Sequence, residues 1–125
     1  MQTIEIPRHD WPAALNEFGL VHRTWLVSLD VLDPMMGAQP EVHEVPLAGI
    51  ATESDSSGGT LSIFLERSPA EHLTHTIHAP THIRIERTDE GADVAMQIES
   101  ADGKTTILTF RAAALPETVD GIVRL

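Results

Sequence analysis

The chain has 125 residues, 42% of them hydrophobic, which suits one folded domain and leaves no room for two well-packed ones. It carries 8 Lys and Arg against 19 Asp and Glu, a formal net charge of −11, so nucleic acid and anionic membranes are poor candidate partners. It has no cysteine, which excludes disulfides, thiolate metal sites and cysteine nucleophiles.

The sequence shows no feature of a membrane or exported protein. No apolar stretch approaches the roughly 20 residues that a membrane helix needs. The first eleven residues contain no basic region followed by an apolar run, which a signal peptide would have. We therefore expect a soluble, cytoplasmic protein.

The N-terminal region predicts a strand and a helix. Apolar residues at alternate positions predict a short edge strand over residues 2–6. A short helix follows, because three apolar residues recur at helical spacing and form one stripe: Trp11, Leu15 and Phe18. Asp10 is its expected N-cap and Gly19 its expected C-terminal stop. A helix this short must be stabilised by docking its stripe on a sheet.

The next two segments predict the centre of that sheet. Residues 24–32 show the clearest strand pattern, with one apolar side formed by Trp25, Val27, Leu29 and Val31. Residues 41–52 also favour a strand, but Pro46 and Gly49 interrupt it. Since proline cannot donate to a strand ladder, this segment is an edge strand, a bulge or a bend between two strand halves.

The second half of the chain predicts one short helix among strands. Residues 60–66 form a strand with Leu61, Ile63 and Leu65 on one face. Ser68-Pro69-Ala70-Glu71 has the pattern of a capping box and predicts a short helix over residues 69–77. Hairpin turns then separate three strands, at residues 83–86, 93–99 and 105–110. Residues 112–125 have no clear period and predict an irregular tail.

These elements predict a single α+β domain over residues 1–125. We expect a five- or six-stranded antiparallel meander, either an open sheet or a small barrel, with the N-terminal helix and the short helix near residues 69–77. Aromatic residues are scarce, at 4% of the chain, and we expect them to be the large pieces of the core: Trp11, Trp25, Phe18, Phe64 and Phe110.

The histidines are the one unusual feature with possible chemistry. Four of the seven lie within eleven residues: His72, His75, His78 and His82. On the predicted helix, the spacing of three places the first ones on one face, with Glu71 just ahead of them. Imidazoles converging with a carboxylate could hold a divalent metal such as zinc or nickel. The alternative is a set of solvent-exposed or locally capping histidines, since no H-E-x-x-H motif is present.

No catalytic motif stands out elsewhere. The chain has no G-x-S-x-G elbow, no G-x-G-x-x-G fingerprint and no P-loop. We therefore name no catalytic residue, and the divalent metal is the only cofactor that we consider. Whether the protein is an enzyme stays open, although the sequence favours a protein without enzymatic activity.

Segments along nearly the whole chain carry a family resemblance. They include Ile6-Pro7-Arg8, Trp11-Pro12, Trp25-Leu26-Val27, Leu73-Thr74-His75-Thr76-Ile77 and Ile98-Glu99-Ser100-Ala101-Asp102-Gly103. Together they resemble a family of small bacterial proteins that carries only a domain-of-unknown-function label. The resemblance implies a free-standing bacterial protein, and it brings no activity, cofactor or catalytic residue.

Three functional hypotheses follow from the sequence. The first is a non-enzymatic β-rich domain that binds a protein partner or itself, for example as a homodimer that covers an open strand edge. The second is a divalent-metal-binding protein or metal-dependent enzyme that uses residues 71–82. The third is a small-ligand carrier with an interior cavity.

Overall fold

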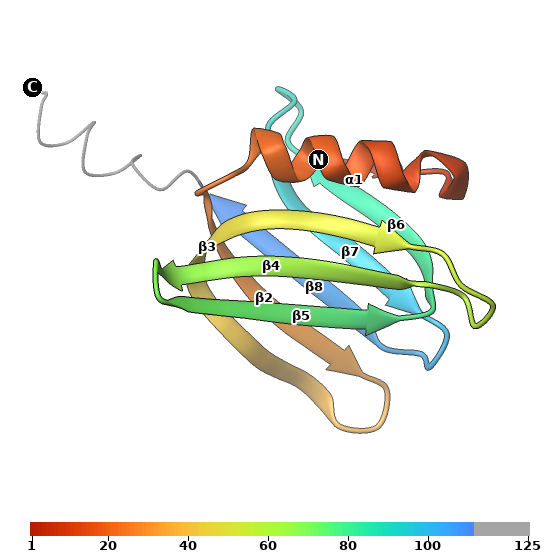
Figure 1. The fold of residues 1–125 in the computed structure, drawn as a ribbon. Coiled ribbons are helices and arrows are strands. Elements are labelled where there is room, and N and C mark those ends of the chain that lie inside the picture. Colours follow the sequence, from red (N-terminus) through yellow and green to blue (C-terminus); the bar gives the residue numbers. More distant parts are fainter. Residues whose placement is uncertain (112–125) are drawn as a thin grey trace, which may run out of the picture.

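The computed structural model describes residues 1–111 and contains one curved sheet and one main helix (Figure 1). Eight strands form the sheet in the order β1-β6-β7-β8-β2-β3-β4-β5, and all neighbouring strands are antiparallel. The strands are β1 (Gln2–Glu5), β2 (Leu26–Asp33), β3 (Gly37–Glu53), β4 (Thr60–Ser68), β5 (Glu71–His78), β6 (Pro80–Arg87), β7 (Asp93–Ser100) and β8 (Thr105–Arg111). The helices are the 3-10 helix η1 (Arg8–Asp10) and α1 (Trp11–Val21).

The sheet folds over into two layers. In Figure 1, β3, β4 and β5 form the near layer, and β6, β7 and β8 lie behind them, with α1 across the top. Within residues 1–111 the edge strands β1 and β5 do not pair with each other, so the sheet is open and is not a closed barrel. The predicted antiparallel α+β architecture is confirmed, but the predicted number of five or six strands is wrong.

The predicted short helix over residues 69–77 is also wrong. Pro69 and Ala70 form a tight turn between β4 and β5, where the sequence predicted a helix start. The residues after the turn pair with β4 along the whole length of β5, from Glu71 opposite Ser68 to His78 opposite Thr60. Proline fits the turn as well as it fits the first turn of a helix, so the local motif was ambiguous.

β3 connects the two layers because it bends in the middle. Its first half pairs with β2 and its second half pairs with β4. Glu44, near the middle, adopts a φ of 50°, and register shifts interrupt the β3 ladders. Of the alternatives open for this segment, the edge strand is wrong, because β3 lies between β2 and β4, whereas bulge-type register shifts and a bend between two strand halves both occur. Pro46 lies at the change of partner, opposite Leu26 of β2.

α1 docks on β3 by the predicted stripe, whose residues Trp11, Leu15 and Phe18 are all buried. The prediction that Gly19 ends the helix is wrong, because α1 continues to Val21. Gly19 is buried inside the helix, and a Cβ atom there would lie 2.9 Å from the backbone nitrogen of Ile50. Glycine therefore allows the helix to approach the backbone of β3.

Side chains fill the space between the layers. The most completely buried ones come from all parts of the sheet and from α1: Leu15, Val27, Leu29, Leu47, Leu61, Ile63, Leu65, Ile83, Met96, Ile98 and Leu108. Of the five aromatic residues expected in the core, Phe64 is a clear exception, with 39% of its surface exposed. No helix in residues 1–111 combines the length and apolar character that a bilayer crossing requires.

Candidate functional site

The structure separates the four clustered histidines. His72, His75 and His78 lie on β5, where successive side chains point to opposite faces. His72 and His78 are exposed, whereas His75 is partly buried on the inner face beside Ile77. His82 lies on β6, in the other layer. Within the described residues, no group of three or more His, Cys, Asp or Glu side chains is placed to hold a metal ion.

The remaining member of the predicted metal set is paired to a cation. Glu71 Oε2 lies 2.7 Å from Arg67 Nη1, across the β4–β5 turn. His72 Nε2 lies 3.2 Å from the carbonyl oxygen of Pro69, a local contact of the kind that the alternative to metal binding predicted. The metal site itself remains a prediction.

His75 has the most perturbed surroundings of these side chains. It lines a cleft of about 240 Å³ between β5, the β2–β3 hairpin and the β7–β8 hairpin. Burial lowers the pKa of His75 from its ordinary value, and the nearby negative charge of Glu41 opposes that effect. The structure thus favours a neutral imidazole on the inner side of β5.

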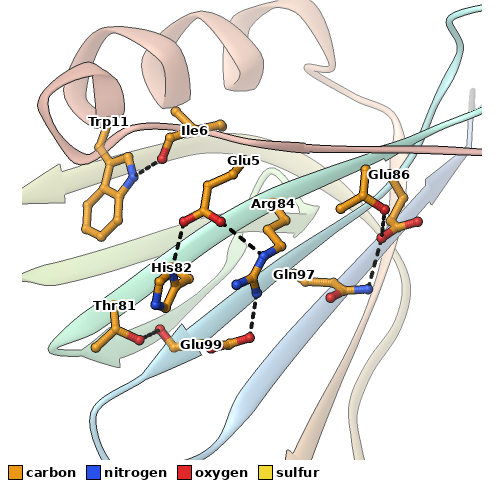
Figure 2. Close-up of polar contacts among 10 residues, drawn as sticks. Glu5, Ile6, Trp11, Thr81, His82, Arg84, Glu86, Gln97 and Glu99 are labelled. Atoms are coloured by element: carbon orange, nitrogen blue, oxygen red, sulfur yellow. Dashed lines mark hydrogen bonds and ion pairs between the residues drawn. The ribbon is translucent and has the colours of Figure 1, made fainter.

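The outer face of β1, β6 and β7 carries a closed network of charges (Figure 2). Glu5 Oε2 accepts a hydrogen bond of 2.7 Å from His82 Nδ1, and Glu5 Oε1 lies 3.2 Å from Arg84 Nε. Arg84 also binds Glu99, with 2.5 Å between Nη1 and Oε2. The hydrogen bond from His82 and the charge of Arg84 lower the pKa of Glu5. Each of these groups has a partner within the network, since His82 and Arg84 both contact Glu5 and Arg84 also contacts Glu99.

A second network joins α1 to β7. His22, only 3% exposed, directs Nδ1 to the carbonyl oxygen of Phe18 at 2.9 Å and Nε2 to Asp93 Oδ2 at 3.1 Å. Its ring also stacks on the Phe18 ring, with 4.0 Å between centroids. Both ring nitrogens are engaged, so His22 holds the fold together and has no free nitrogen for general base catalysis.

The outer surface where α1 meets β3 and β4 has the opposite character, and we call it the Phe64 face. It contains a hollow of about 200 Å³. The hollow is lined by Asn16, Gly19, Leu20, Ala48, Gly49, Ile50, Ala51 and Phe64, none of which is charged. Leu20 is 64% exposed and Phe64 is 39% exposed, and both line the hollow.

The sequence contained a signal for the position of Phe64 that the prediction did not use. Leu61, Ile63 and Leu65 form the buried face of β4, and Phe64 lies between two of them. By the alternation of a strand, Phe64 must point away from the core. The sequence could not predict the hollow that Phe64 lines, because its other residues come from two other elements, α1 and β3.

The edge strand β5 is the other open feature of this layer. It pairs with β4 on one side, and its second side has no strand partner within residues 1–111. Such an edge is a potential pairing surface for another chain. It lies next to β4, the strand that carries Phe64.

Comparison with known proteins places the chain in a family. One family model matches residues 2–118, almost the whole sequence. The chain belongs to the family of unknown function DUF5335. The family resemblance seen in the sequence is thereby confirmed, whereas a bacterial source remains a prediction. No curated protein and no solved structure matched this DUF5335 chain.

Proposed function

We propose that this chain is a non-enzymatic β-rich domain that associates with a second copy of itself through the Phe64 face. The observation that carries the proposal is a hollow lined only by uncharged residues, among them the aromatic Phe64, which is 39% exposed, on a chain of net charge −11. Exposed aromatic side chains in such surroundings are typical anchors of protein interfaces.

Electrostatics support a second copy as the occupant. Two molecules with a charge of −11 repel each other, and the repulsion is strongest where carboxylates meet. A contact between copies is therefore favoured where the surface is free of charge. The Phe64 face meets that condition, since its hollow has no charged residue in its lining.

The arrangement of the face also supports a symmetric dimer. In a two-fold contact the same patch occurs on both subunits, so the patch must fit a copy of itself. Phe64 and Leu20 line one hollow on a single face. A two-fold axis at this hollow would bring the Phe64 ring against Leu20 of the partner subunit, which is 64% exposed in the single chain.

The test is the mass in solution of the protein and of two variants, by analytical ultracentrifugation. We expect the unaltered chain to sediment at twice its monomer mass of 13.6 kDa. Phe64→Glu should be a monomer, because it places two like charges in the contact. Met36→Glu is the matched control, since Met36 is 70% exposed in the β2–β3 turn and outside the Phe64 face, and it should remain a dimer. A monomeric unaltered chain at high concentration, or a dimer that survives Phe64→Glu, would rule out the proposal.

A further inference from the structure

We infer that a groove at the start of α1 binds a small organic monocarboxylate with an apolar body. The groove lies between η1 and the end of the β3–β4 hairpin and has a volume of about 570 Å³. This volume is within the range of about 300–1,000 Å³ that small-molecule sites occupy. The groove shares no residue with the lining of the Phe64 face, so this inference is independent of the proposed dimer.

Arg8 supplies the charge that would bind the carboxylate. Its Nη2 donates to the carbonyl oxygen of Pro80 at 2.9 Å, and its guanidinium carbon lies 4.3 Å from the centroid of the Trp11 ring. These two contacts fix the side chain at the groove. A guanidinium has five N–H donors in a planar fork, so most of them remain for a carboxylate.

Arg8 also lacks an acidic partner within residues 1–111, as does Arg23, which lies outside the groove. Five other Lys and Arg side chains of that range form ion pairs: Arg67, Arg84, Arg87, Lys104 and Arg111. The chain has 19 Asp and Glu to offer. Arg8 is held in place without a carboxylate partner, so its positive charge faces the groove.

The other walls of the groove select the rest of the ligand. Trp11, Pro12 and Pro80 give the groove an apolar wall, most of whose accessible surface belongs to the exposed Pro12, and this wall suits an aromatic or aliphatic body. Glu53 also lines the groove, and its charge disfavours ligands with several negative charges, such as phosphates. A single carboxylate on an apolar body fits both conditions.

Benzoate is the probe for the test, and the indole N–H signals of the two tryptophans are the readout. Trp11 lines the groove and Trp25 lies outside it, so in every sample the Trp25 signal is an internal control for the Trp11 signal. We expect benzoate to shift the Trp11 signal in two-dimensional NMR spectra in a saturable way and to leave the Trp25 signal in place. Benzyl alcohol, which has the same ring without the charge, should produce at least a tenfold weaker effect.

Two substitutions and a control decide whether Arg8 is responsible. Arg8→Gln should weaken benzoate binding at least tenfold, whereas Arg23→Gln should not change it, since Arg23 likewise makes no ion pair within residues 1–111 but lies outside the groove. Glu53→Gln leaves Arg8 intact and should strengthen binding. The inference is overturned if benzoate does not move the Trp11 signal or if Arg8→Gln binds equally well. If Arg8→Gln does not fold, the test is the affinity of Glu53→Gln for benzoate. Unchanged or weaker binding by Glu53→Gln would then overturn the inference.

Discussion

At the scale of single residues, His22 shows how one polar side chain is accommodated in the core. Its Nδ1 lies 2.9 Å from the carbonyl oxygen of Phe18 in α1, and its Nε2 lies 3.1 Å from Asp93 Oδ2 on β7. Asp93 also accepts from Arg87 Nε at 2.6 Å, so its carboxylate is shared between His22 and Arg87. Buried polar groups are tolerated when all of them are paired in this way.

His75 predicts a specific dependence of stability on pH. Burial lowers its pKa in the folded chain, so the unfolded chain binds a proton at a higher pH than the folded one does. The free energy of unfolding should therefore fall as pH drops below about 6.5, by at most about 1.4 kcal/mol per pH unit from this group. Urea unfolding at pH 7.5 and 5.5 measures the fall, which should be smaller in His75→Gln.

His72→Gln is the matched control for that measurement. His72 is exposed on the same strand, and its substitution should leave the fall in stability as it is in the unaltered chain. An equal fall in His75→Gln and in the unaltered chain would contradict the assignment to His75.

The separated histidines also lead to a prediction about metals. Because His75 and His82 lie on different layers and the other two point away from His75, we expect zinc or nickel to leave the thermal unfolding midpoint unchanged. A ligand that binds the folded state must raise that midpoint. A rise that disappears in His75→Ala would instead support the metal-binding hypothesis.

At the scale of elements, the close contact between α1 and β3 requires a residue without a side chain at Gly19. In an isolated helix, alanine is more favourable than glycine by about 1 kcal/mol. Here the added Cβ would lie 2.9 Å from the backbone nitrogen of Ile50, so α1 would have to move off β3. We expect Gly19→Ala to lower the free energy of unfolding by about 1–3 kcal/mol, measured by urea denaturation.

Glu17→Ala is the control for this helix substitution. Glu17 is exposed on α1 and lies outside the Phe64 face, and alanine there should leave stability unchanged or raise it by a few tenths of a kcal/mol. If Gly19→Ala were as stable as Glu17→Ala, the helix would not be held by its close approach to β3.

β5 is the element for which local signals and long-range pairing disagree. Ser68 to Glu71 satisfies the helix-start pattern, yet Thr74, Thr76 and Ile77 are β-branched residues that favour a strand. The ladder with β4 decides between them, because it pairs every residue from Glu71 to His78 and satisfies the backbone groups that face β4. A turn of two residues at Pro69 and Ala70 was sufficient to bring the strands together.

At the scale of the whole molecule, charge is distributed unequally over its surfaces. The outer face of β1, β6 and β7 carries alternating charges that pair with one another, as Glu5, Arg84 and Glu99 do. The Phe64 face beside α1 has none in its hollow. On a chain of net charge −11, a hollow lined only by uncharged residues is a place where two copies can approach.

The sequence by itself determined the elements whose patterns are local. The stripe of α1, the alternation of β2 and β4, and the hairpins of β6, β7 and β8 follow from the spacing of apolar residues, and the structure confirms them. The sequence also gave the family resemblance, which the match over residues 2–118 confirms. The predicted irregular tail over residues 112–125 lies outside the described residues.

Only the tertiary structure decided what depends on distant partners. The pairing of β5 with β4 separated the histidines, and the docking of α1 on β3 gave Gly19 its role and created the hollow beside Phe64. Arg8 reaches Pro80 across 72 positions of the sequence, which no local pattern could indicate. Spacing along a chain fixes which face a side chain shares with its near neighbours, but the fold alone determines what that face meets.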